Sequence, residues 1–165
     1  MIGPGGGRCC RTTLAGLLRD EGEGMRAEDK TEPKGLVAAS DNRTLNEKQE
    51  DLKRRLKSYA LRILKIYDSL PKHGSVHIIT HQLARSGTSP GAHYREACRA
   101  KSDADFISKI EGGLQELDES HYWLELLVDG DHISDQKLLP LIEETNELIA
   151  IFVSIVTKVK SRKSK

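Results

Sequence analysis

The sequence contains few aromatic residues and few cysteines, and it has no long apolar run. Aromatic residues make up 4% of the chain and charged residues 31%, which is typical of a helical bundle with charged faces and excludes a β-sandwich. The three cysteines, two of which are adjacent (Cys9 and Cys10), do not form a disulfide framework, so we expect a reducing, cytoplasmic location. The longest apolar run, Leu148 to Val156, is interrupted by Ser154 and falls far short of the roughly 20 residues that cross a membrane. We therefore expect no membrane association.

The chain also lacks an excess of charge of either sign. It has 26 lysines and arginines against 25 aspartates and glutamates, which is not the overall basic signature of a nucleic-acid-binding protein. Its 165 residues are enough for one ordinary domain. Residues 1–42 are rich in glycine and show no sustained apolar periodicity, so we expect a disordered N-terminal tail and assign residues 43–162 to a single domain.

The apolar periodicity of this domain predicts four helices. The first begins at Thr44, where Glu47 completes a capping box, and ends before Pro71. The second spans about 75–100, the third starts at Ser102 and reaches the turn at 129–131, and the fourth spans about 134–160. Four long helices with short turns predict an all-α fold, an antiparallel up-and-down four-helix bundle.

Each helix has an apolar row whose spacing alternates between three and four residues, or nearly so. The expected core positions are Leu52, Leu56, Tyr59, Ile63, Ile66 and Leu70; Ile79, Leu83, Tyr94 and Ala97; Phe106, Ile110, Leu114, Leu117, His121, Leu124 and Val128; and Leu141, Thr145, Leu148, Phe152, Ile155 and Val159. The fourth helix has further apolar residues beside its row, namely Ile142, Ile149, Ile151, Val153 and Val156. A helix this broadly apolar predicts a second buried face, hence self-association.

A cluster of helix-breaking residues, Gly87, Pro90 and Gly91, lies in the middle of the second helix. Proline has no N–H, and its ring clashes with the carbonyl four residues earlier, so we expect a kinked second helix. The hydroxyl groups of Thr88 and Ser89 would serve the freed backbone groups. Alternatively, Ser89 and Pro90 would be the N-cap and first residue of a new helix after a full break.

Two segments together resemble one known family. They are Arg85-Ser-Gly-Thr-Ser with Gly91-Ala and Tyr94-Arg-Glu-Ala, and Asp118-Glu-Ser with Tyr122-Trp-Leu-Glu-Leu-Leu127. In these the chain resembles the bacterial four helix bundle protein family, which includes the proteins encoded in 23S ribosomal RNA intervening sequences and the accessory protein of diversity-generating retroelements. The resemblance covers roughly residues 45–162 and implies a kinked second helix and a homopentameric ring. For the retroelement relative it also implies binding to RNA and to a reverse transcriptase.

We expect the polar residues of the two segments to link helices or subunits around the kink, because polar groups in a bundle interior must be paired. The alternative is a solvated charged face. The candidate contact residues are Arg85, Ser86, Gly87, Thr88, Pro90, Gly91, Tyr94, Arg95, Glu96, Asp118, Glu119 and Trp123.

Basic residues gather in two places despite the neutral balance. Candidates for nucleic-acid contact are Arg54, Arg55 and Lys57, and the C-terminal Lys158, Lys160, Arg162, Lys163 and Lys165. Such clusters bind phosphates without sequence preference, and the C-terminal set also suits the negative end of a helix dipole.

No pattern predicts a catalytic centre, a metal site or a cofactor. His73, His77 and His81 have helical spacing, but two histidines on one face are half a zinc site and no further ligand lies at a fitting offset. A di-iron bundle needs Glu-x-x-His on two helices, and this motif is absent from the sequence. The sequence therefore predicts a non-enzymatic, self-assembling scaffold or binding protein whose partners are its own copies, with RNA or another protein as a further candidate. The alternative function is that of an RNA-binding accessory protein.

Overall fold

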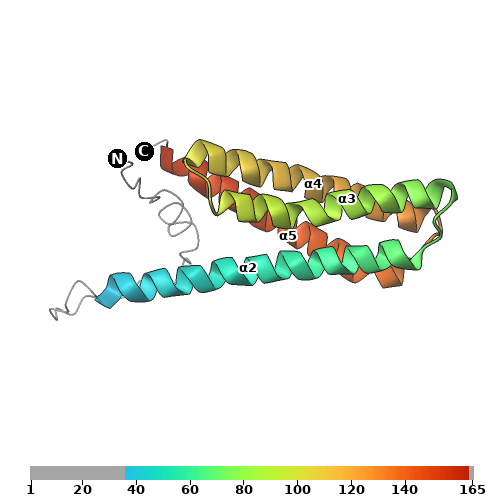
Figure 1. Ribbon diagram of the computed structural model, residues 1–165, viewed down its shortest axis with the longest axis horizontal. Coiled ribbons are helices and arrows are strands. Elements are labelled where there is room, and N and C mark those ends of the chain that lie inside the picture. The colour runs from blue at the N-terminus through green and yellow to red at the C-terminus, as the bar shows by residue number, and fades with distance from the viewer. Residues whose placement is uncertain (1–35, 164–165) are drawn as a thin grey trace, which may run out of the picture.

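The computed structural model describes residues 36–163, with side chains from Asn46 to Arg162. These residues form four helices: α2 (Leu36–Ser69), α3 (Gly74–Ala97), α4 (Asp103–Asp129) and α5 (Asp135–Lys163). Consecutive helices run in opposite directions, and no strand occurs in the described range (Figure 1). The all-α antiparallel bundle predicted from the sequence is therefore confirmed. Of the tail expected at residues 1–42, residues 1–35 lie outside the described residues.

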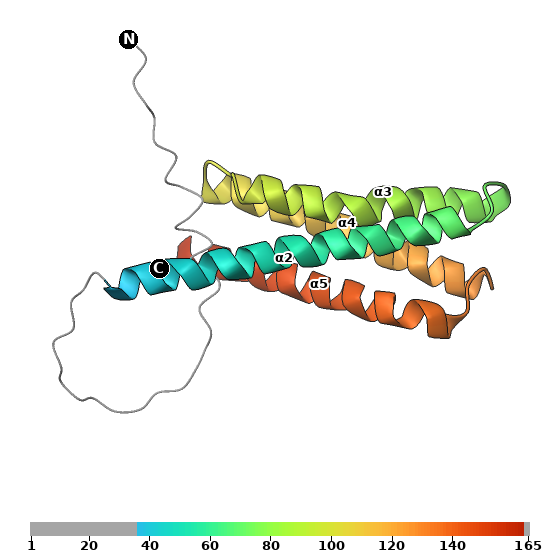
Figure 2. The same ribbon diagram turned by 60° about the horizontal axis from the view of Figure 1, so that its bottom comes forward.

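The start of the first helix differs from the prediction. α2 begins at Leu36, so Thr44 lies inside the helix and is not its N-cap, and residues 36–42, assigned to the tail, are helical. Extending an existing helix over residues such as Ala38 and Ala39 costs little, because the expensive nucleation step has already been made. The first turns of α2 project beyond the ends of the other helices (Figures 1 and 2).

The proline in the second helix does not divide it. α3 continues through Pro90 to Ala97, so the alternative of a full break and restart is wrong. The Thr88 hydroxyl donates to the carbonyl of Ala84 at 2.8 Å and the Ser89 hydroxyl to that of Arg85 at 2.8 Å. These carbonyls precede that of Ser86, the one that Pro90 deprives of its usual N–H donor.

Local signals at the other helix ends agree with the sequence. Ser102 is the N-cap of α4, and its hydroxyl accepts a hydrogen bond from the backbone N–H of Asp105 at 3.2 Å. Gly130 ends α4, and Asp131 adopts a positive φ of 55° in the turn to α5. Aspartate tolerates this left-handed conformation better than most residues, so the tight turn forms there.

The core occupies the space between the four predicted rows. All six row positions of α5 are buried, as are Leu56, Tyr59 and Ile63 of α2. On α4 the buried stripe includes Gly113, Ser120 and Leu127, whereas Leu114, His121 and Val128 are partly exposed. The stripe of α4 is therefore turned from the predicted one, because small residues at 113 and 120 allow its neighbours to approach closely.

Candidate binding and assembly surfaces

The two segments that carry the family resemblance lie against each other where α3 packs on α4. Nη2 of Arg85 donates to both carboxylate oxygens of Glu119, at 2.9 and 3.1 Å. The indole N–H of Trp123 donates to the same carboxylate at 3.1 Å. Beneath this exposed cluster, the buried hydroxyl of Ser120 donates to that of Ser86 at 2.9 Å. Glu119 and Ser120 therefore join the two helices by polar contacts inside one subunit.

The small residues of the 85–97 segment allow α2 to approach α3 closely. A Cβ atom added to Gly87 would lie 2.8 Å from Cγ1 of Ile63, a separation that real Cβ atoms do not adopt. Pro90 and Tyr94 are buried beside it, and the ring of Tyr94 contacts that of Phe152 at a centroid separation of 6.1 Å. This part of the segment serves packing.

The remaining charged residues of the two segments lie at the surface. Glu96 forms an ion pair with Lys109 of α4 at 3.1 Å. Arg95 and Asp118 are exposed, and Asp118 has no ion-pair partner in the described chain. The segments thus combine interhelical links with solvated charges.

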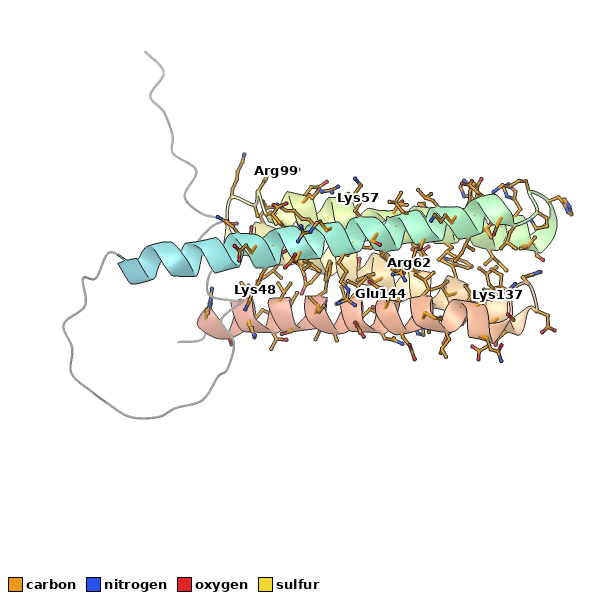
Figure 3. The ribbon with its side chains drawn as sticks, turned by 90° about the horizontal axis from the view of Figure 1, so that it is seen from below. Lys48, Lys57, Arg62, Arg99, Lys137 and Glu144 are labelled. Atoms are coloured by element: carbon orange, nitrogen blue, oxygen red, sulfur yellow. The ribbon has the colours of Figure 1, made fainter. Side chains whose placement is uncertain are left out.

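A cluster of arginines and glutamates joins α2 to α5. Arg55 bonds to Glu144 at 3.0 Å and also to Glu147, and Arg62 bonds to the second oxygen of Glu144. Figure 3 shows Arg62 and Glu144 extending toward each other from the two helices. Burial alone would raise the pKa of Glu144, but its hydrogen bonds to Arg55 and Arg62 and their positive charges lower that pKa below its usual 4.5. Next to this cluster, the buried hydroxyls of Tyr59 and Thr145 lie 2.9 Å apart.

These ion pairs correct one part of the predicted nucleic-acid surface. Arg55 is only partly exposed and holds two carboxylates of its own chain, so it does not form a free basic patch with Arg54 and Lys57. Arg54 pairs with Asp51, whereas Lys57 is exposed and has no ion-pair partner in the described chain. No sequence motif marked Glu144 as the partner, because the two helices are far apart in the sequence.

The C-terminal basic residues belong to a helix. α5 extends to Lys163, and Lys160 forms an ion pair with Glu111 of α4 at 2.7 Å. Lys158 and Arg162 are exposed on the last turns, the side chain of Lys163 is not described, and Lys165 lies outside the described residues.

An open cleft of about 460 Å³ lies near the same end of the bundle, between α2 and α3. It is lined by three cationic side chains, Lys53, Arg95 and Arg99, and also by Asn46, Gln49, Glu50 and Cys98. Lys53 forms an ion pair with Glu50 at 2.7 Å, so part of the positive charge is balanced. The sequence analysis missed Lys53 and Arg99, which become neighbours only when the start of α2 packs beside the end of α3.

The three histidines do not form a metal centre. His77 and His81 make an edge-on ring contact at 6.3 Å, and His77 also lies beside Tyr67 at 6.4 Å. No group of three or more histidine, cysteine, aspartate or glutamate side chains is placed to hold a metal ion among the described residues. Within the same range, no helix has the length and apolar character of a membrane span.

Several apolar residues of α5 remain outside the core. Leu139 and Val153 are each 45% exposed, and Ile142 and Ile149 are only partly buried. With the exposed Asn146 and the buried Val156 they form a row, here called the α5 outer row, in which consecutive members are three or four residues apart. This is the broad apolar character that the sequence analysis found; within one chain the row is only partly covered.

Fold and surface together define a four-helix-bundle protein whose distinctive residues link and pack helices. The chain matches the family model described as 23S rRNA-intervening sequence protein over residues 48–154, and it belongs to that family. It is also similar to a Bacteroides thetaiotaomicron protein described as having unknown function and as coming from the S23 ribosomal protein family. The two chains are 34% identical with a TM-score of 0.61, and the match covers 67% of this chain and 98% of the other. No curated protein sequence matches the chain.

Proposed function

We propose that this chain is a non-enzymatic scaffold or binding protein that assembles with its own copies into a homopentameric ring. The observation that carries the proposal is the α5 outer row, in which Leu139 and Val153 are exposed and Ile142 and Ile149 are only partly buried in a single chain. Burying such side chains contributes about 25 cal/mol per Å² of apolar area removed from water, so a second protein surface on this row would be stabilising. The number five rests on the family resemblance alone.

A single substitution in the α5 outer row tests self-assembly. We expect Val153→Glu to shift the protein from the oligomer to the monomer in light scattering coupled to size exclusion, because the new carboxylate would be desolvated in the subunit contact. The matched control is Ile78→Glu, which places the same charge at an exposed apolar position on α3, away from the row. Dissociation by both variants alike, or by neither, would contradict a specific role of the row.

A second candidate function is RNA binding, which the cationic cleft and the C-terminal turns of α5 favour. Lys53, Arg95 and Arg99 lie at the end of the bundle that also carries Lys158 and Arg162. In a ring with parallel subunits these groups would lie on one rim and would add their positive potentials. The rim would bind phosphates with an affinity that falls as salt increases.

Charge reversal in the cleft tests this second function. We expect the double substitution Arg95→Glu and Arg99→Glu to lower RNA affinity at least ten-fold in filter binding at 50 mM salt. The control Lys137→Glu removes a positive charge from the start of α5, at the opposite end of the bundle (Figure 3). Wild-type protein that retains no RNA even at low salt would exclude the RNA-binding function.

A further inference from the structure

We propose that the subunit contact is formed by the outer side of α2 in one copy and by the outer surface along which α4 packs on α5 in the next. This inference rests on the proposed self-assembly and assigns its two surfaces. The α2 outer face consists of Arg54, Lys57, Leu61, Leu64 and Lys65. The α4/α5 surface consists of Leu114, Asp118 and Glu125 on α4 and the α5 outer row together with Glu143 on α5.

The α2 outer face lies on the side of α2 opposite its core residues. Arg54, Lys57, Leu61 and Leu64 are spaced by three or four residues, so they share one side of the helix. All of them are exposed, and the two leucines are large apolar side chains at 50% and 38% exposure. This face combines two leucines with lysine and arginine side chains, whose stems are apolar and whose ends are positively charged. It is therefore suited to a partner surface that is apolar in the middle and acidic at its edges.

The α4/α5 surface is located by the contacts of its own helices. The α5 outer row continues in register to Lys160, which pairs with Glu111 of α4, so the row faces the α4 side of α5. On α4, Leu114, Asp118 and Glu125 continue the side that begins at Glu111. Leu114 is partly exposed, whereas Asp118 and Glu125 are exposed. The apolar middle of this surface is therefore bordered by carboxylates.

The charges of the two surfaces are complementary. Lys57 and Lys65 have no ion-pair partner in the described chain, and the same holds for Asp118 and Glu143. If either surface packed against its own copy about a twofold axis, lysine would approach lysine or carboxylate would approach carboxylate. The pairing of one surface with the other is therefore favoured, and a contact of this head-to-tail kind closes into a ring or grows into a filament.

The two surfaces also lie at matching positions along the bundle axis. The Arg62–Glu144 ion pair and the Tyr59–Thr145 hydrogen bond place Leu61 at the level of the residues around Glu143 of α5. The close approach of Gly113 to Phe152 places Asp118 beside the middle of the α5 row, and it places Glu125 beside the start of that row, near Leu139. Rotation about an axis parallel to the helices preserves these levels. Leu61 and Leu64 would then face Ile142 and Leu139, and Lys57 would face Asp118.

A charge exchange tests the pairing. We expect Lys57→Glu alone and Asp118→Lys alone to shift the protein to monomer mass in light scattering at micromolar concentration, because each brings like charges together. The double variant carrying both substitutions should recover the oligomer mass, since it restores an attractive pair in every contact. Lys101→Glu, at an exposed position in the α3–α4 connection, is the matched control and should leave the mass unchanged. Circular dichroism confirms that each variant keeps its helices.

A third substitution tests the apolar part of the same face. We expect Leu61→Glu to dissociate the oligomer, because Leu61 would be buried against the neighbouring subunit. A wild-type protein that is monomeric would contradict self-assembly itself. A wild-type oligomer unchanged by Lys57→Glu and Leu61→Glu would leave self-assembly standing but would overturn this assignment of surfaces. Single variants that dissociate without recovery in the double variant would overturn the Lys57–Asp118 pairing.

Discussion

Replacing Gly113 with valine should lower the free energy of unfolding by about 3 kcal/mol. A Cβ atom at this position would lie 2.7 Å from Cε2 of Phe152 and 3.2 Å from Cβ of His93. Phe152 is fully buried, so its ring cannot turn away without opening the core between α4 and α5. The added side chain must therefore push the helices apart, and this cost exceeds the roughly 1 kcal/mol by which a residue other than glycine improves helix propensity.

The preceding glycine provides the matched control. A Cβ atom at Gly112 would meet only the outer part of the His93 ring, at 3.1 Å from Cε1, and this ring is partly exposed. We expect Gly112→Ala to change stability by less than about 1 kcal/mol, whereas Gly113→Ala should be clearly destabilising. Urea unfolding followed by circular dichroism measures both. Equal effects at the two positions would contradict the explanation that the close approach to Phe152 excludes a side chain at position 113.

Replacing Glu144 with glutamine should lower the free energy of unfolding by about 2 kcal/mol at pH 7. The carboxylate accepts hydrogen bonds from Arg55 and Arg62, so the neutral amide would leave the Arg62 guanidinium without its counter-charge and would leave Arg55 with Glu147 alone. Glu147→Gln is the control, because that side chain is mostly exposed and pairs only with Arg55. We expect a loss below about 1 kcal/mol for the control, as is usual for exposed ion pairs.

The Glu144 effect should depend on pH in a definite direction. The pKa of Glu144 is lowered in the folded protein from its usual 4.5, so its ionised form stabilises the fold. This stabilisation is complete above pH 4.5 and disappears as the pH falls through the lowered folded-state pKa. The difference between wild type and Glu144→Gln should therefore be constant near neutral pH and shrink in acid. A difference that persists unchanged at pH 3 would contradict the ion-pair explanation.

If the α2 outer face and the α4/α5 surface form the subunit contact, the basic residues of α2 have two different roles. Arg55 stabilises the fold within its own chain through Glu144 and Glu147. Lys57, two residues later, lies on the outer side of the helix and is free to contact another copy. A sequence cluster that suggested one nucleic-acid patch is thus divided between two helix faces, because neighbouring residues on a helix point about 100° apart.

Much of the fold could be predicted because its signals are local. The alternation of three and four residues in the α5 core row, from Leu141 to Val159, fixes which side of the helix is buried. Ser102 caps α4 as expected, since its hydroxyl needs only a backbone N–H three residues away. Local patterns whose meaning depends on the residues that precede them gave a wrong prediction. Thr44 and Glu47 resemble a capping box, but the helix had already started at Leu36.

The candidate surfaces could be predicted only in part. The excess apolar width of α5 is visible in the sequence because Ile142, Ile149 and Val153 lie beside the core row. The cationic cleft is not, since Lys53 in the middle of α2 and Arg99 just after α3 are far apart in the sequence and meet only when the helices pack.

The sequence by itself determined the four helices, the core side of α5 and the family to which the chain belongs, because periodicity, caps and motifs are properties of neighbouring residues. Only the tertiary structure decided that Gly113 faces Phe152 while Gly112 faces the edge of His93, and that Arg55 and Arg62 share Glu144. It also decided which charges remain unpaired at the surface. These outcomes depend on how far each helix is rotated and shifted against its neighbours. Packing of the whole core sets that rotation and shift, and no single segment encodes them.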